Sequence, residues 1–242
     1  LPGEAGYPAY LSARLAGFYE RSARVRTLGG QEGSVTVIGA VSPPAGDFSE
    51  PVTLHTKRFV RCFWALDPDR ARARFYPAIH PLTSYSEDAN RVAPWWHAHG
   101  NSEWAKHRER LLILLEQQAK LERMARIVGK DALPAAQQVT LTCADLVNEG
   151  LLRQSSFSAV DRYCSPLRQA AMLRVIVHFV DRAERAVAEG IEPGPIAALP
   201  VLATLARLGE EYGEDRVGEI ERLWNEIDDG FHALEEARDA VR

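Results

Sequence analysis

The sequence predicts an α/β plus α protein in which helices dominate, an incomplete α/β layer followed by a C-terminal helical bundle. Two short runs, residues 34–41 and 59–66, are rich in β-branched or aromatic residues, which is typical of strands buried in a sheet. From about residue 102 onward, apolar residues recur every three or four positions, the period of packed helices. We therefore expect an α/β part over residues 1–100 and a helical domain over residues 101–242.

Composition and charge exclude some classes of partner. The formal net charge is −4, whereas nucleic-acid-binding surfaces usually carry a basic excess, so we expect no nucleic-acid partner. The longest strongly apolar runs, residues 111–115 and 175–177, are far shorter than the roughly 20 residues of a membrane-spanning helix. Any membrane association would therefore pass through partners. The chain begins with Leu-Pro-Gly-Glu, without a methionine or a signal-peptide pattern, and we expect a longer parent polypeptide.

The first 53 residues predict a helix, a buried strand and a stiff loop. Apolar spacing predicts a helix from Pro8 to Val25, stopped by Gly29 and Gly30. Residues 34–41 then form the expected core strand. The next eleven residues, 42–52, hold three prolines, one glycine and two acids, so we expect a fixed, non-helical path. Loops at the ends of buried strands are where α/β proteins place function.

The middle of the chain predicts a second buried strand, a short helix and an irregular connection. Asp67 and Pro68 are typical of a helix start, and this helix is expected to run to Arg74. Residues 76–101 are expected to be irregular and to link the two domains. His97 and His99 lack the further ligands that zinc requires, so we expect no metal there. Three widely spaced cysteines are expected to be buried free thiols: Cys62, Cys143 and Cys164.

The second half predicts a series of helices. The first has an apolar face that runs from Leu111 to Val128 and stops at Gly129, and the next lies between Pro134 and Gly150. Residues 167–189 are apolar on more than one face, as a central bundle helix should be. A short helix follows over residues 196–205. The last helix carries an apolar seam at steps of three and four: Val217, Ile220, Trp224, Ile227, Phe231 and Leu234.

Common catalytic motifs are absent from the sequence. A P-loop requires G-x-x-x-x-G-K-[ST], and the Gly129-Lys130 pair is followed by Asp131 and preceded by Met124 at the other glycine position. The sequence contains no G-x-S-x-G, no H-E-x-x-H and no G-x-G-x-x-G after a strand. Residue patterns alone therefore predict a fold but indicate no catalytic activity.

Six separated stretches nevertheless resemble, in order, the catalytic A subunit of V-type and A-type rotary proton-translocating ATPases. These are EAGYPAYLSARLAGFYERSARV (4–25), GAVSPPAGDFSEPVT (39–53), FWALD (63–67), FYPAIHPLTSYS (75–86), VDRYC (160–164) and LPVL (199–202). The resemblance implies the C-terminal part of that subunit: an incomplete P-loop (RecA-like) nucleotide-binding core followed by the helical domain. It departs from the family pattern at Ala45, His80 and Pro81, and YPAIHPL also resembles the F-type β subunit.

The resemblance implies two sites. Tyr76, Phe157 and Tyr163 would enclose an adenine, and stacking of one base on an aromatic side chain contributes about 1–3 kcal/mol. The alternative is that these are core residues. The second site is a turn that would face the central rotor shaft, and the alternative there is a simple interhelical turn. Its residues are Gly129, Lys130, Asp131, Ala132 and Leu133.

The resemblance also implies what the chain lacks and what it binds. The phosphate loop, the catalytic glutamate and the magnesium ligands would precede Leu1, so no catalytic or metal-binding residue is expected here. ATP or ADP with Mg²⁺ would bind the intact subunit, and the chain alone would hold no nucleotide tightly and would be inactive. The partners would be the non-catalytic B subunit, in an alternating hexamer, and the rotor shaft.

The implied location is cytoplasmic and peripheral to the membrane, in the soluble sector of a machine that moves protons or sodium ions. Two alternatives stay open. One is a stand-alone helical interaction module derived from this family. The other is the equivalent part of an F-type or secretion-associated ATPase.

Overall fold

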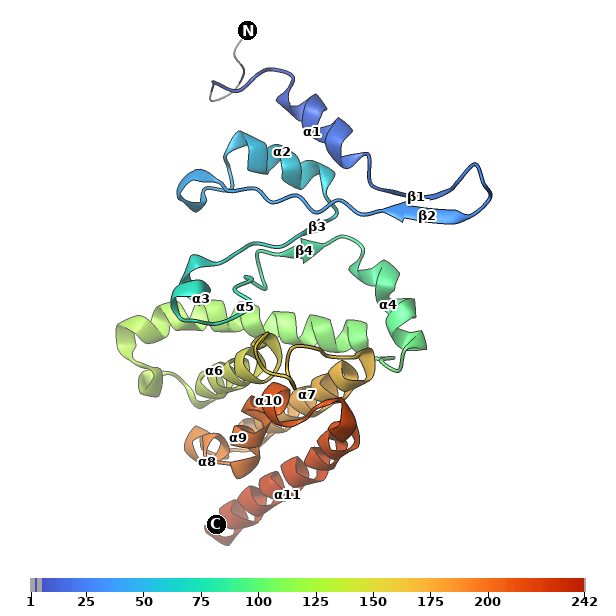
Figure 1. Ribbon diagram of the computed structural model, residues 1–242. Helices are drawn as coiled ribbons and strands as arrows, with labels where there is room; N and C mark the ends of the chain where they lie inside the picture. Colours follow the sequence, from blue (N-terminus) through green and yellow to red (C-terminus); the bar gives the residue numbers. More distant parts are fainter. Residues whose placement is uncertain (1–2, 4–5, 242) are drawn as a thin grey trace. The chain divides into compact units, whose positions relative to one another are not determined.

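The computed structural model describes residue 3 and residues 6–241, and helices dominate these residues (Figure 1). The described part also contains two small sheets, each of two antiparallel strands. The chain divides into two compact units. The N-terminal unit comprises residues 1–64 and 85–88, and the helical unit comprises residues 65–84 and 89–242.

The N-terminal unit is built from a helix pair and two short strand pairs. Helix α1 (Leu11–Tyr19) packs against α2 (Pro51–Phe59). Strand β1 (Ala23–Arg26) pairs with β2 (Glu32–Val35), and β3 (Cys62–Phe63) pairs with β4 (Tyr85–Ser86). The β1–β2 turn is closed by Thr27, whose N–H donates to Gln31 O at 2.8 Å. Gly30 has φ +82° in this turn, a conformation that favours glycine.

Two predictions for this region are wrong. The helix expected to reach Val25 ends at Tyr19, and Val25 lies in β1. The strand expected at residues 34–41 is not a core strand, because β2 ends at Val35 and the side chain of Ile38 is 82% exposed. The cause is the same in both cases. Gly29 and Gly30 form a hairpin turn rather than a helix stop, so the β-branched run pairs locally on the surface.

The proline loop contains more helix than the sequence predicts. A 3₁₀ turn covers η2 (Pro44–Gly46), and α2 begins at Pro51. The Glu50 carboxylate caps α2 by accepting the N–H groups of Val52 and Thr53, both at 3.0 Å. These bonds favour the ionised form and lower the pKa of Glu50 to about 2. The predicted strand at 59–66 is accordingly short, because Phe59 still belongs to α2.

The helical unit follows the predicted succession of helices, except that the one helix expected over residues 196–205 is wrong: a first helix ends at Ala197 and a second begins at Pro200. Asp67 caps α3 (Pro68–Arg72) as expected, by accepting the Asp69 N–H at 2.8 Å. The region expected to be irregular contains α4 (Ala89–Ala98). The remaining elements are α5 (Trp104–Val128), η3 (Lys130–Ala132), α6 (Ala135–Val147), the π-turn η4 (Asn148–Leu152), α7 (Pro166–Ala188), α8 (Pro193–Ala197), α9 (Pro200–Ala206), α10 (Leu208–Glu211), η5 (Glu214–Arg216) and α11 (Val217–Val241).

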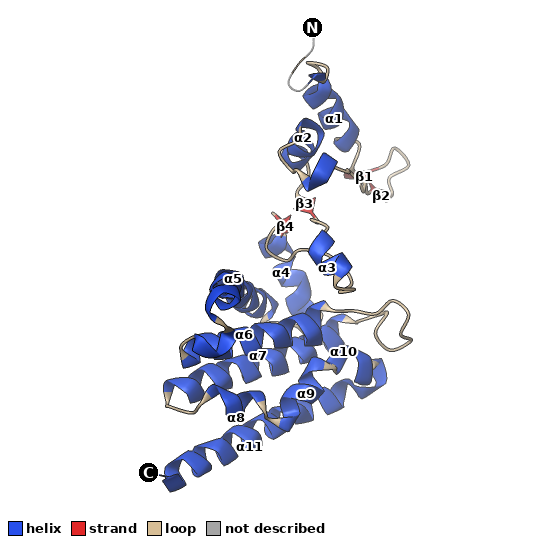
Figure 2. Ribbon diagram, turned by 90° about the vertical axis from the view of Figure 1, so that its left-hand side faces the viewer, coloured by secondary structure: helices blue, strands red, loops and turns tan. Residues whose placement is uncertain are grey.

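The core of this unit lies around α7. Helices α6 and α7 lie between α5 and α11 in both views (Figures 1 and 2). Phe179 of α7 and Phe231 of α11 are fully buried, with ring centroids 5.5 Å apart. Trp224, predicted in the same seam, is 40% exposed and stacks on His178 at 3.6 Å. In the described residues, no helix is long and apolar enough to cross a membrane.

Three further side chains depart from the expected burial. Val128, predicted on the apolar face of α5, is 56% exposed because the last turn of that helix lies at the surface. Cys62 is exposed and Cys164 is half-buried, so only Cys143 is the fully buried thiol that the sequence predicts. Burial raises the pKa of Cys143 to about 12.

Candidate functional site

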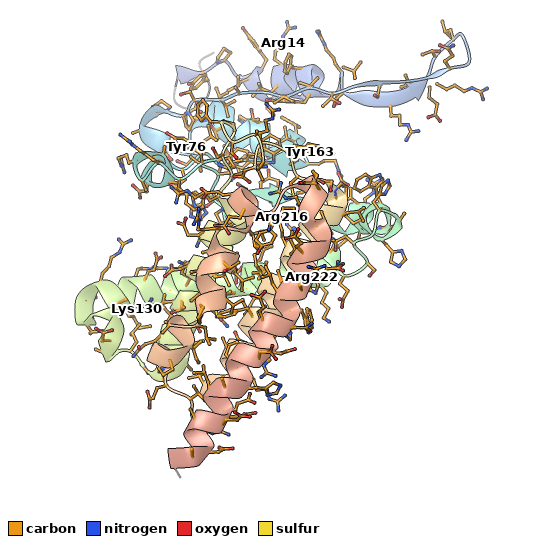
Figure 3. All side chains as sticks on the ribbon, turned by 60° about the horizontal axis from the view of Figure 1, so that its bottom comes forward. Arg14, Tyr76, Lys130, Tyr163, Arg216 and Arg222 are labelled. Carbon is orange, nitrogen blue, oxygen red and sulfur yellow. The ribbon has the colours of Figure 1, made fainter. Side chains whose placement is uncertain are left out.

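The three aromatic residues singled out in the sequence all lie in the helical unit and none is a core residue. Tyr76 follows α3 and is 54% exposed. Phe157 and Tyr163 lie in the connection between η4 and α7, residues 153–165, and are 100% and 63% exposed. Tyr76 and Tyr163 lie away from Lys130 (Figure 3). The alternative that these three residues fill a core is therefore wrong.

Hydrogen bonds join the segment that carries Tyr76 to the segment that carries the other two rings. The backbone N–H of Gln154 donates to the Tyr76 carbonyl at 2.8 Å. Six residues before Tyr76, Arg70 of α3 donates to the Asn148 side-chain oxygen at 2.8 Å. The Arg70 guanidinium also lies 4.4 Å from the centroid of the Phe75 ring, a cation–π distance. Tyr76 is thus attached to the base of the 153–165 connection.

No two of these three rings stack on each other in the part of the chain that the structure describes. Exposed, unstacked aromatic rings offer π-faces to a flat ligand, and a purine base is such a ligand. Each exposed ring therefore presents a face on which a base can stack.

Buried polar groups hold the 153–165 connection in place. Arg168 of α7 is fully buried and donates to the carbonyls of Val160 and Tyr163, at 2.9 and 2.7 Å. The Asp161 carboxylate, 6% exposed, accepts the N–H of Ser155. Each loop carbonyl so bonded is satisfied without water, which fixes the backbone around the exposed rings.

Sequence reasoning missed Arg168. Asp161 falls within the quoted VDRYC stretch, but Arg168 is one of several arginines on an amphipathic helix, and such residues are usually exposed. Ser165 provides the local signal: its side chain caps α7 by accepting the Arg168 N–H at 3.1 Å, with Pro166 next in the chain. This cap places Arg168 in the first turn of α7, beside the connection.

The second predicted site is the turn between α5 and α6. Gly129 ends α5 with φ +88°, and Leu133 is buried against Leu121 and Leu141. Lys130 forms an exposed ion pair with Asp145, with Nζ and Oδ2 3.7 Å apart. The turn also has an apolar border that the sequence reasoning did not single out, formed by exposed side chains on the last turns of α5: Met124, Ile127 and Val128.

Metal ligation has no support among the described residues, where no three His, Cys, Asp or Glu side chains lie together in a suitable cluster. His99 instead packs on Trp95, with ring centroids 3.9 Å apart and its Nδ1 2.7 Å from the Trp95 carbonyl oxygen. An open groove of about 590 Å³ runs along α5 near Trp104 and Ile113. It contains none of the three predicted aromatics.

The chain matches two protein families. Residues 1–86 match the nucleotide-binding domain of the ATP synthase alpha/beta family, and residues 93–194 match the C-terminal domain of V and A type ATP synthase.

Individual relatives agree with these matches. The A subunit of the A-type ATP synthase of Pyrococcus abyssi is 46% identical over 97% of this chain and 23% of its own length. The A subunits of Thermococcus onnurineus and Methanopyrus kandleri are 47% and 44% identical, over 91% and 97% of this chain and 38% and 40% of their own lengths. The chain thus spans well under half of these relatives. Among solved structures, the ATP synthase subunit NeqB of Nanoarcheaum equitans superposes with a TM-score of 0.60 at 26% identity, over 75% of this chain and 41% of that one.

Proposed function

Because this chain belongs to the family of A-type ATP synthase A subunits, we propose that it is the C-terminal part of the catalytic A subunit of a rotary ATPase. Residues 1–100 would then be the end of a P-loop (RecA-like) nucleotide-binding core, and residues 101–242 its helical domain. In the intact machine, nucleotide-driven movement of the helical domain would couple ATP hydrolysis or synthesis to proton or sodium transport.

The contribution of this chain to nucleotide binding is an adenine site formed by Tyr76, Phe157 and Tyr163. The observation that carries this proposal is the Gln154 N–H bond to the Tyr76 carbonyl, at 2.8 Å, which attaches Tyr76 to the connection that carries the other two exposed rings. A base stacked on such rings needs no hydrogen-bond partner, because every purine has a π-face. The site would orient the base while other residues of the intact subunit hold the phosphates.

Among the described residues, no three His, Cys, Asp or Glu side chains form a cluster that could hold a metal ion. The phosphate loop, the catalytic glutamate and the magnesium ligands would lie outside this sequence. This chain alone would therefore bind ATP weakly and would not hydrolyse it.

The α5–α6 turn is the proposed contact with the central rotor shaft, through Lys130, Asp131 and the apolar border of Met124, Ile127 and Val128. The exposure of these three apolar side chains supports a protein contact rather than a solvated turn. The B subunit would be the neighbour in an alternating hexamer. The complex would lie at the cytoplasmic side of the membrane, and this chain would reach the membrane only through it.

Photolabelling with an ATP analogue that carries an azide on the adenine ring tests the site. Covalent capture detects weak binding, and mass spectrometry of the digested chain locates the label. We expect labels at Tyr76 and within residues 157–163, removed by excess ATP but not by inorganic triphosphate. Tyr10 is as exposed as Tyr163, at 63%, and serves as the internal control that is expected to stay unlabelled. Labelling elsewhere, or labelling that ATP does not displace, would contradict the proposal.

A further inference from the structure

Arg168 is the largest completely buried side chain among the described residues. No ion pair among the described residues includes Arg168. Its guanidinium therefore has no carboxylate within salt-bridge distance. Its guanidinium instead donates to three backbone carbonyls, those of Val160, Tyr163 and Gly209, at 2.9, 2.7 and 2.8 Å. Burying a cation costs free energy, so its retention with this set of acceptors points to a specific task.

The three acceptors belong to two different parts of the fold. Nη1 bonds both carbonyls of the 153–165 connection, and Nη2 bonds Gly209 in α10. The planar guanidinium presents these donors in a fixed geometry, which a lysine ammonium cannot reproduce. Arg168 therefore clamps the connection between α7, which carries it, and α10.

The connection is also closed on itself through Asp161. The Asp161 carbonyl accepts the side-chain Nε2 of Gln154 at 2.7 Å, and its carboxylate accepts the Ser155 N–H. The Ser158 hydroxyl accepts the N–H groups of Val160 and Asp161, both at 3.2 Å. The ring of Phe157 stays fully exposed at the end of this closed framework.

We propose that Arg168 is a positioning residue for adenine binding, which rests on the proposed function of Tyr76, Phe157 and Tyr163. It does not touch the base. It acts through the Val160 and Tyr163 carbonyls, which it fixes before the nucleotide arrives. A connection already held in its binding conformation loses less conformational entropy when the base stacks on its rings, so affinity rises without an added contact.

The experiment compares Arg168→Met with Arg174→Met. Arg174 lies on the same helix, is 35% exposed at its side chain and pairs with Glu221 on α11, so its substitution makes the same chemical change away from the connection. Two readouts are taken on the whole chain: amide hydrogen exchange of residues 155–163 without nucleotide, and the shifts of the Phe and Tyr ring resonances during titration with ATP. Inorganic triphosphate serves as the control for binding through phosphate alone.

We expect Arg168→Met to speed the exchange of these amides and to raise the apparent Kd for ATP about tenfold, while Arg174→Met changes neither. Faster exchange with an unchanged Kd would show a structural role only and would overturn the proposal. An unchanged exchange rate would overturn it as well. If the rings of the unsubstituted chain do not respond to ATP, the adenine site itself fails, and the positioning role fails with it.

Two milder variants keep the proposal testable if Arg168→Met does not fold, which circular dichroism would reveal. Arg168→Lys keeps the charge and loses the forked geometry. Gln154→Ala leaves Arg168 intact and removes one hydrogen bond to the Asp161 carbonyl, for which we expect about a threefold rise in Kd. ATP affinity equal to that of the unsubstituted chain in both variants would contradict the positioning role.

Discussion

Two connections of the helical unit differ in the burial and charge of the groups that hold them. The 153–165 connection is fixed by buried polar groups, Arg168 and Asp161, which leave its aromatic rings exposed. The α5–α6 turn is held by the buried Leu133 side chain and by the exposed ion pair of Lys130 with Asp145. The half-buried Gln138 amide also donates to the carbonyls of Asp131 and Leu133, at 3.2 and 2.8 Å. Both connections project side chains outward, but only the first is bonded by a fully buried charged side chain, Arg168.

This difference matches what each surface would have to do. A site that stacks a base must keep its rings within a narrow range of positions, and buried hydrogen bonds give that constraint. A surface that meets a moving partner needs exposed apolar area and charge, and a surface ion pair contributes only about 0–1 kcal/mol. The comparison therefore predicts large effects of substitutions beneath the first connection and small effects at the second.

The largest effect in this comparison is expected for Gly209→Ala, in α10 beneath the 153–165 connection. A Cβ atom at this position would lie 2.6 Å from Oδ1 of the buried Asp161, whose other carboxylate oxygen, Oδ2, accepts the Ser155 N–H. We expect the substitution to displace that carboxylate and to lower the free energy of unfolding by about 1–3 kcal/mol. Chemical denaturation of the two proteins measures this difference.

Gly218→Ala is the matched control. Gly218 lies in α11, and a methyl group added there would meet no atom within 4 Å, so alanine gains helix propensity at no steric cost. We expect stability to stay the same or to rise by up to about 1 kcal/mol. Equal changes in stability for the two glycine variants would mean that the packing of Asp161 on α10 does not hold the connection.

The smallest effect is expected for Lys130→Glu, which replaces the exposed ion pair with Asp145 by two like charges. We expect a loss of less than about 1 kcal/mol in the free energy of unfolding, because both side chains are largely solvated. In the intact subunit, the same change together with Asp131→Lys should alter coupling between hydrolysis and rotation more than ATP affinity. A change confined to ATP affinity would argue against a shaft contact at this turn.

The helices of the helical unit could be predicted from the sequence because the patterns that define them lie between residues close together in the chain. Steps of seven and four between Ile220, Ile227 and Phe231 already define the buried face of α11, and Gly129 marks the end of α5. The same reasoning placed Val128 inside, although its side chain is 56% exposed at the end of the helix. The apolar period of a helix predicts which side is buried. How far along the helix that burial extends depends on the elements packed against it.

The N-terminal unit was less predictable because its strands and turns depend on which segments pair. The apolar run at residues 34–41 has the composition of a core strand, yet β2 pairs within an exposed hairpin whose turn contains Gly29 and Gly30. Helix α2 was missed, although Glu50 followed by Pro51 is a usable start signal. The neighbouring prolines, which favour an irregular path, obscured that signal.

The candidate site likewise contains residues that could be predicted from the sequence and one that could not. The positions of Tyr76, Phe157 and Tyr163 came from a resemblance between sequences, since no spacing rule connects residues so far apart. Arg168 was found by neither route, because Ser165 and Pro166 indicate where α7 begins but not that this arginine is buried. Only the three carbonyl acceptors around it distinguish it from an exposed arginine.

The most direct test of the adenine site is the ATP affinity of Tyr76→Ala beside that of Tyr10→Ala. Tyr10 is a comparably exposed tyrosine, 63% against 54%, and lies in the N-terminal unit rather than in the helical unit. Titration followed by the ring resonances of Phe157 and Tyr163 is predicted to give an apparent Kd about tenfold higher for Tyr76→Ala and an unchanged Kd for Tyr10→Ala. An unchanged Kd for Tyr76→Ala in a folded chain would contradict the adenine site.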